Sequence, residues 1–257
     1  MNPALTYAPS RGLGEKIARR MTQAHVARPA RVKLPRGALS VCFDDFPVSA
    51  AEAGAAALER FDARGTFYAA AGMSGEDGPA GKCFSAAQLR RLAASGHEIG
   101  CHTYGHVDCA KTDADEFISE CARNAIELAL FGHRAPLRSL AFPFGETNRH
   151  VKDALPDDFT SARGINPGLN HGWVDLAQLK AYPFYGWAAL EPLLAALQKA
   201  HDKRAWMIVF THDVGQEPSK WGAPLGALGA LLRRARDLKM DISPVGDIAD
   251  RIIAANE

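Results

Sequence analysis

Residues 39–47 read LSVCFDDFP, and this stretch decides how the rest of the chain is interpreted. The run from Leu39 to Phe43 is apolar and of strand length, two carboxylates follow it, and Pro47 ends it. Such a continuous apolar run is typical of a strand buried on both faces in a parallel sheet. Two adjacent acids at its carboxyl end repel each other unless a proton or a cation lies between them. The stretch therefore indicates a buried strand that ends at a metal site.

A simpler interpretation of Asp44 and Asp45 is structural, because short carboxylates also begin turns and cap helices. A second motif favours the metal site. Residues 97–101 form another strand-like run, and residues 102–106, which follow it, read HTYGH. Two histidines four residues apart lie on one side of a helical turn, so both rings can reach one ion. One carboxylate and two imidazoles leave positions open for water and substrate, as a catalytic site requires.

Length and composition are those of an ordinary soluble protein. The chain has 257 residues, of which 47% are hydrophobic and 23% charged, and its formal net charge is +1. This length suits one large α/β barrel or two small domains with a packed core. The five cysteines are odd in number and contain no Cys-x-x-Cys pair, so we expect reduced, structural thiols. They are Cys42, Cys83, Cys101, Cys109 and Cys121.

Residues 1–37 carry eight lysines and arginines and a single acid, Glu15. A transit peptide, a nucleic-acid patch and a contact with an acidic membrane are possible interpretations. No nucleic-acid motif accompanies the charge, so we expect no nucleic-acid partner. We predict instead a basic N-terminal arm, helical over residues 14–25, that packs across the barrel bottom or against a neighbouring subunit in a homo-oligomer. No long apolar run marks a secretory signal or a membrane span, and a cytoplasmic location is expected.

Strand-like and helix-like segments alternate through residues 38–257. Strands are predicted at 39–45, 65–68, 97–101, 137–142, 159–163, 179–185, 206–210 and 242–245, and helices at 50–63, 85–95, 112–131, 191–201, 225–239 and 248–255. A strand followed by a helix, repeated about seven times, implies a parallel α/β barrel in a single domain. The motif residues all follow strand ends, which form the active-site face of such barrels.

Four short motifs carry a resemblance to a known family. They read FDD at 43–45, HTYGH at 102–106, FPFG at 142–145 and FTHD at 210–213. In this order the motifs resemble those of the polysaccharide deacetylases with a NodB homology domain, carbohydrate esterase family 4. The resemblance extends from about residue 39 to about residue 248. It implies a distorted (β/α)7-type TIM-like barrel and a metal-dependent hydrolase that removes an N-acetyl group from an amino sugar or its polymer.

The resemblance also assigns roles. It implies that Asp45, His102 and His106 are metal ligands and that Asp44 is the general base that takes a proton from a metal-activated water. The expected cofactor is one divalent ion, with zinc first and cobalt, nickel or iron as alternatives. The substrate implied is an acylated amino sugar or another amide.

Two further groups would complete the reaction. The backbone N–H of Phe144 is implied as the donor to the oxyanion of the tetrahedral intermediate. His212 is implied as the acid that protonates the leaving amine, since imidazole titrates near neutrality. Asp213 either orients His212 or caps the next turn.

The chain departs from the family pattern at several positions. Ala141 stands where many members have the arginine that holds the base, and we expect Arg163 to replace it rather than Arg138, which begins a strand. The aspartate–tryptophan pair that tunes the acid histidine is missing, and Asp175 is a weak stand-in. Phe46 replaces the usual glycine after the acid pair.

Other features remain unassigned. Aromatic residues could stack on sugar rings but more often pack in the core or at a rim, so none is assigned to binding. They are Trp173, Trp187, Trp221, Tyr104 and Tyr185. Residues 72–81 are rich in glycine but lack the lysine of a phosphate-binding loop, which favours a flexible surface loop.

Two alternative functions stay open. The same site could act on another amide, such as an N-formyl sugar, a cyclic imide or a linear amide. The chain could also be a catalytically silent metal-binding or assembly protein that uses its basic arm as the contact surface. Retention of a base, three ligands and an acid favours the enzyme.

Overall fold

The centre of the fold is strand β2 (Ala38–Asp44), whose seven residues are all buried. The computed structural model describes residues 12–257. In it β2 pairs in parallel with β11 (Trp206–Thr211) on one side and with β3 (Thr66–Ala69) on the other. The prediction of a doubly buried parallel strand before the two acids is therefore confirmed.

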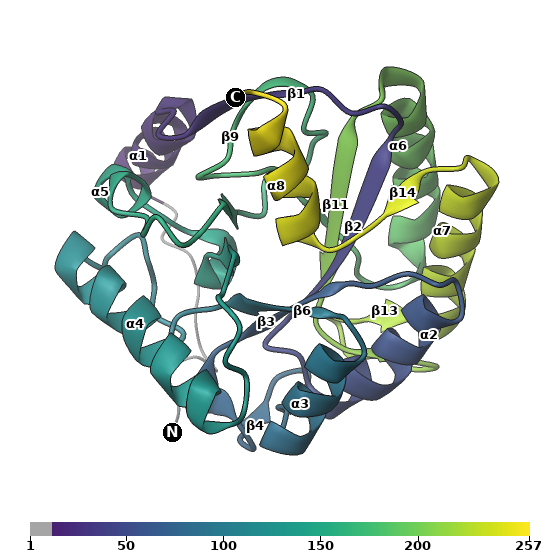
Figure 1. Ribbon diagram of the computed structural model, residues 1–257, viewed down its shortest axis with the longest axis horizontal. Helices are drawn as coiled ribbons and strands as arrows, with labels where there is room; N and C mark the ends of the chain where they lie inside the picture. The colour runs from purple at the N-terminus through teal and green to yellow at the C-terminus, as the bar shows by residue number, and fades with distance from the viewer. Residues whose placement is uncertain (1–11) are drawn as a thin grey trace.

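The sheet around β2 is parallel and curls into a distorted barrel (Figure 1). Its strand order is β10-β11-β2-β3-β6-β7-β8, and β14 also pairs with β2. The remaining strands are β6 (Glu98–Cys101), β7 (Ser139–Ala141), β8 (Ser161–Arg163), β10 (Tyr182–Pro183) and β14 (Asp241–Ile242). Leu179 links the two ends of this order, since its N–H donates to Ala162 O at 2.9 Å and its carbonyl accepts from Gly164 N at 3.1 Å. The predicted (β/α)7-type fold is confirmed.

Helices pack around the sheet (Figure 1). They are α2 (Ala55–Glu59), α3 (Ala86–Ala94), α4 (Ala114–Leu130), α5 (Arg149–Asp153), α6 (Leu190–Lys203) and α7 (Leu225–Asp237). Ser85 caps α3 as predicted, and Asp113 caps α4 by accepting from Glu116 N at 2.8 Å. The helix predicted over 50–63 is split, because Ala50–Gly54 is π-helical. Within residues 12–257, no helix combines the length and apolarity that crossing a membrane requires.

Helix α8 (Val245–Ala254) covers one end of the barrel and is drawn between β9 and β11 in Figure 1. Its buried residues Ile248 and Ile252 share an apolar cluster with Trp206, the first residue of β11. Arg138, which precedes β7, pairs with Asp247 and Asp250 of α8, both at 2.6 Å. Helix α8 therefore lies at the amino ends of the strands, and the opposite end remains for the site.

Small sheets that the sequence did not indicate complete the fold. Strand β1 (Pro29–Val32) pairs antiparallel with β9 (Gly172–Asp175). Strands β4 (Asp77–Gly78) and β5 (Gly81–Lys82) form a hairpin inside the predicted glycine-rich loop. Strands β12 (Val214–Gly215) and β13 (Ala223–Pro224) pair after β11, and the 3-10 turns are Ala71–Met73, Pro143–Gly145 and Trp187–Ala189. All five cysteines are buried and free, as predicted.

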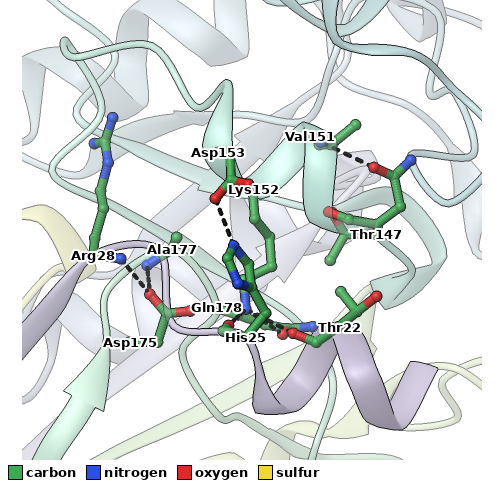
Figure 2. Close-up of polar contacts among 11 residues, drawn as sticks. Thr22, His25, Arg28, Thr147, Val151, Lys152, Asp153, Asp175, Ala177 and Gln178 are labelled. Atoms are coloured by element: carbon green, nitrogen blue, oxygen red, sulfur yellow. Dashed lines mark hydrogen bonds and ion pairs between the residues drawn. The ribbon is translucent and has the colours of Figure 1, made fainter. Parts of the chain in front are cut away.

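The predicted arm begins, where it is described, with helix α1 (Leu13–Ala24). A buried lysine on α5, Lys152, donates to the carbonyl of Thr22 at 2.9 Å and also to that of His25, while His25 lies 2.6 Å from Asp153 (Figure 2). These contacts fix the end of α1 against α5. The part of the arm before residue 12 lies outside the described residues, and a domain boundary at residue 37 stays a prediction.

Candidate metal centre and active-site cleft

A cleft of about 510 Å³ contains the predicted site residues. Six of its lining residues are those named from the sequence: Asp44, Asp45, His102, His106, Phe144 and His212. Each follows or ends a strand of the barrel, so the carboxyl ends of parallel strands bring together segments that are far apart in the sequence. A cleft of this size is typical of a small-molecule site.

Asp45, His102 and His106 form a compact cluster in the cleft. The Asp45 Oδ1 atom is 3.3 Å from His106 Nε2 and 3.5 Å from His102 Nε2. One ligand atom from each of the three side chains lies within 4.8 Å of the other two. The two imidazole rings meet edge to face, with centroids 4.9 Å apart. One cation can therefore be shared by all three side chains.

The surroundings of His102 fix it as a neutral donor of an electron pair. Its Nδ1 is 2.7 Å from the Ala141 carbonyl oxygen, which accepts only a proton-bearing nitrogen. The Nε2 atom, which faces Asp45, is then left with its lone pair for a metal. Burial lowers the pKa of His102 to about 4, although Asp45 opposes the shift. The ring is therefore neutral at physiological pH.

The residues present fit a divalent cation. Within the described chain, Asp45 Oδ1 is buried and accepts no hydrogen bond. Burial opposes ionisation of this carboxyl, but His106, His102 and other neighbours outweigh it and hold the pKa of Asp45 below its usual value. A buried anionic oxygen that faces the lone pair of His102 Nε2 is costly without a cation between them. One carboxylate and two imidazoles suit zinc and allow other transition metals.

Backbone conformation sets these side chains in place. Seven non-glycine residues of the described chain have positive φ, and four of them belong to the site: Asp45 (52°), Thr103 (55°), His106 (54°) and Phe144 (58°). The other three, Asp62, Arg204 and Lys239, follow helices α2, α6 and α7, where a left-handed residue commonly ends a helix. A left-handed conformation costs non-glycine residues energy and concentrates at functional sites.

The expectation that the two histidines share a helical turn is wrong. Residues 102–106 form no helix, and the chain reverses through left-handed residues at Thr103 and His106. Thr103 Oγ1 stabilises the reversal by accepting a hydrogen bond from Val107 N at 3.1 Å. The rings still converge, because this tight turn brings residues four apart as close as a helix does.

Asp44 is held separately from the metal cluster. It ends β2, and Arg163, which ends β8, donates from Nη2 to Asp44 Oδ1. The Arg163 guanidinium is buried, and its central carbon lies 4.8 Å from the Tyr68 ring centre and 4.9 Å from that of Phe210. Burial opposes the charge, but the Asp44 carboxylate outweighs it and raises the pKa of Arg163. The structure thus places Arg163 against Asp44, the residue expected to act as base, as predicted in place of an arginine at Ala141.

His212 follows β11, the strand next to β2, and has aromatic neighbours. Its ring centre is 6.0 Å from that of Tyr185 and 6.4 Å from that of Trp221. Its Nδ1 atom is buried and has no hydrogen-bond partner among residues 12–257. Asp213 does not orient this ring, because its oxygens accept from Ser219 N at 2.7 Å and Ser219 Oγ at 2.6 Å. Of the two interpretations of Asp213, the turn is correct.

Asp175 does not replace the missing family aspartate. It ends β9, outside the cleft lining, and accepts hydrogen bonds from Arg28 N at 2.9 Å and Ala177 N at 3.0 Å (Figure 2). Its other oxygen forms an ion pair with the buried Lys152 at 2.8 Å. The expectation that Asp175 tunes His212 is wrong, because these contacts commit its carboxylate to the packing of the arm.

Several residues that line the cleft had no role assigned from the sequence. Tyr185 and Trp221 flank His212, and Glu146 and Lys220 add one charge of each sign. The β4–β5 hairpin adds Gly78 to Gly81 to the wall. Composition alone could not separate these aromatics from the others, of which Trp173 and Trp187 are 72% and 60% exposed. Phe46, in place of a glycine, is buried and stacks on Phe84 at 4.3 Å.

Comparisons with known proteins agree with this geometry. Residues 31–157 match the family model described as polysaccharide deacetylase, and this span includes Asp44, Asp45, His102, His106 and Phe144. No protein with a curated description matches the chain in sequence.

The fold is similar to several solved structures. One is a putative polysaccharide deacetylase from Mycobacterium smegmatis, with a TM-score of 0.68, 18% identity and coverage of 90% of this chain and 96% of that one. A family 4 carbohydrate esterase from Streptomyces lividans in complex with acetate gives 0.53 at 15% identity, with coverage of 81% and 92%. A family 4 pseudoenzyme from Bacillus anthracis gives 0.58 at 12%, with coverage of 86% and 68%. Residues 31–157 are therefore similar to the polysaccharide deacetylase family, and the whole barrel has the fold of the solved polysaccharide deacetylase structures.

Proposed function

We propose that this protein is a metal-dependent hydrolase that removes an N-acetyl group from an amino sugar or its polymer. The observation that carries the proposal is the convergence of Asp45, His102 and His106 within 4.8 Å, beside an Asp44 carboxylate that Arg163 holds. A structural metal site closes its coordination with four protein ligands, whereas three leave room for reactants.

Asp45, His102 and His106 would hold the cation, with zinc as the first choice. When bound, a divalent cation supplies Lewis acidity, which polarises an amide carbonyl and acidifies water. The low pKa of His102, caused by burial, keeps its ring available as a neutral ligand well below pH 7.

Asp44 is proposed as the general base. Its carboxylate lines the cleft next to Asp45 but carries its own partner, the buried Arg163. The guanidinium fixes the orientation of one Asp44 oxygen. As the water oxygen forms its bond to the acetyl carbon, the water proton passes to Asp44.

Phe144 is proposed to stabilise the oxyanion through its backbone N–H. Its φ of 58° turns the chain sharply after Pro143, and the residue lines the cleft. The Phe144 ring packs edge to face on His106 with centroids 4.5 Å apart, which couples the position of this turn to a proposed ligand. Loss of one such donor typically lowers kcat by about 10²–10³-fold.

His212 is proposed as the general acid. It lines the same cleft as Asp44 and gives a proton to the amide nitrogen as the carbon–nitrogen bond breaks. The products are acetate and the free amine. Without this proton, the intermediate would expel water more readily than the amine.

The substrate is proposed to be an acylated amino sugar because of the family to which residues 31–157 are similar. Tyr185 and Trp221 offer aromatic surfaces beside His212 on which a sugar ring can stack. The test is a panel of N-acetylated and N-formylated amino sugars, short polymers of them, and cyclic imides. We expect release of acetate from at least one acetylated sugar. Turnover of imides or formyl sugars alone would assign a different amide substrate to the same site. The absence of turnover with metal bound would favour a catalytically silent metal-binding protein.

A further inference from the structure

The outward face of helix α1 is apolar. Leu13, Ile17 and Met21 recur every four residues, and their exposed fractions are 77%, 51% and 55%. Residues at this spacing lie above one another on a helix and form one stripe. Thr22 is the buried residue of α1. The helix therefore rests on the barrel through a narrow polar contact and turns its apolar stripe outward.

A second apolar stripe lies on helix α4. Ile118, Ile126 and Leu130 are exposed to 42%, 63% and 75%, at spacings of eight and four residues. The opposite face of α4 is anchored in the core by Phe117 and Leu128. Proteins that act as monomers rarely expose such extended apolar surface, so both stripes indicate a contact.

The two stripes carry opposite charge. Helix α1 holds three basic residues and one acid, and the exposed Lys16 and Arg20 flank its apolar stripe. Helix α4 holds four acids and one basic residue, and among the acids Glu116 and Glu127 border its stripe. The single basic residue of α4, Arg123, lies over the Tyr104 ring at 3.6 Å. The stripe on α1 is thus complementary to the stripe on α4 in both charge and apolar character.

Both stripes belong to one side of the molecule. Helix α5 lies between them: it packs on α4, and its Lys152 and Asp153 contact the end of α1. Figure 1 shows α1, α5 and α4 in succession along one edge of the barrel. One copy of the chain therefore presents both halves of a complementary pair to the same neighbour.

We propose that this face binds a second copy of the chain in a two-fold dimer, with α1 of each copy lying on α4 of the other. A two-fold axis between the stripes repeats the same contact twice and covers both of them. A lipid surface fits less well, because an anionic membrane would attract the basic α1 and repel the acidic α4.

The test measures the dimer dissociation constant of the full chain by sedimentation velocity, at low and high salt. We expect a dimer that weakens as salt rises, since opposite charges are screened. Lys16→Glu with Arg20→Glu reverses the α1 edge, and Glu116→Lys with Glu127→Lys reverses the α4 edge. Each double variant alone should weaken the dimer by about tenfold or more.

Mixing the two double variants distinguishes this arrangement from others. In the mixed dimer one contact is native and the other has both charges reversed, so its affinity should return to within about threefold of the native value. If α1 contacted α1 instead, the α4 variant alone would dimerise normally. Ile126→Asp should abolish the dimer, whereas Lys203→Glu with Arg233→Glu, on α6 and α7, should leave it unchanged. Circular-dichroism melting confirms that each variant is folded.

Several results would overturn the proposal. These are a native chain that stays monomeric at all concentrations and a failure of the mixed variants to recover. A monomer that binds phosphatidylserine vesicles would overturn it as well, by assigning the basic stripe to a membrane.

Discussion

Two groups of residues line the cleft, the proposed metal ligands (the ligand side) and the surroundings of the proposed acid (the acid side), and they are built differently. On the ligand side, Asp45, His102 and His106 converge on one point, and the Ala141 carbonyl orients one of the rings. Left-handed residues hold the turns there, including Phe144. On the acid side, His212 lies among aromatic rings, and its Nδ1 has no hydrogen-bond partner in the described part of the chain.

The difference indicates that metal binding constrains its residues more tightly than proton donation does. The three proposed ligands would have to meet at one ion. Two of them, Asp45 and His106, have a left-handed backbone, and the matched family region contains all three. An acid needs only to reach the leaving group, and its neighbours can vary. Arg163 lies outside the matched region and reaches Asp44 from the end of β8. The arginine expected from the family pattern would stand at Ala141, at the end of β7. We therefore expect substitutions to have sharper effects on the ligand side.

The largest effect is expected from His102→Ala. Loss of one ligand of three should remove most of the bound metal and lower kcat/KM by about 10³-fold or more, since a catalytic metal supplies several kcal/mol. Elemental analysis and acetate release measure the two effects. His171→Ala, an exposed histidine outside the cleft, is the control. Unchanged metal content in His102→Ala would exclude this ligand set.

Asp44→Asn separates the base from the ligands. The variant should keep its metal and lose about 10²–10⁴-fold in kcat, because an amide cannot accept the proton from water. Asp45→Asn should lose metal as well as activity, which makes the adjacent residue a matched control. Normal turnover by Asp44→Asn would show that another group is the base.

His212→Gln tests the acid side. We expect full metal content and a kcat lowered by about 10²-fold on an acetylated amino sugar. On p-nitroacetanilide, whose leaving amine needs little protonation, the loss should be much smaller. Equal losses on both substrates would contradict a role for His212 as general acid.

Arg163→Met tests the ion pair that positions the base. It leaves Asp44 buried without a partner and should lower the free energy of unfolding by about 3 kcal/mol. Arg163→Lys should recover much of that stability but keep kcat at least about tenfold low, since ammonium lacks the planar fork of a guanidinium. Urea unfolding and kinetics measure both. Arg138→Met, which breaks partly exposed pairs with α8, should cost about 1 kcal/mol or less. Equal losses of unfolding free energy in Arg163→Met and Arg138→Met would contradict the burial of the Arg163–Asp44 pair.

The smallest effect on turnover is expected from Asp175→Asn and Asp213→Asn. Both carboxylates serve packing, one with Lys152 and one with Ser219. Each variant should lower the free energy of unfolding by about 1–3 kcal/mol and leave kcat unchanged. A selective loss of kcat in Asp175→Asn, with an altered pH profile, would restore it as a partner of His212.

The features of the fold and of the candidate site that depend on local sequence patterns could be predicted. The apolar run before Asp44 predicts β2, and the alternation of strands and helices places the motifs at one barrel end. Spacing alone could not predict the backbone of residues 102–106, because a tight left-handed turn and a helical turn both bring residues four apart together.

Long-range contacts account for the rest. The prediction that Asp175 stands in for the aspartate that tunes His212 is wrong, because its partners Arg28 and Lys152 come from segments 147 and 23 residues away. The pairing of β1 with β9 likewise depends on tertiary packing rather than on any local motif. Arg163 was expected to meet Asp44 from the family pattern, and the curl of the sheet is what brings β8 to that position.

The most direct test of the central claim is a titration of chelator-treated protein with zinc while acetate release is followed. We predict that activity is absent without metal, rises linearly and stops rising at one equivalent per chain, and that Asp45→Ala shows no such rise. Full activity in the metal-free protein, or zinc binding that is unchanged in Asp45→Ala, would contradict a cation held by Asp45, His102 and His106.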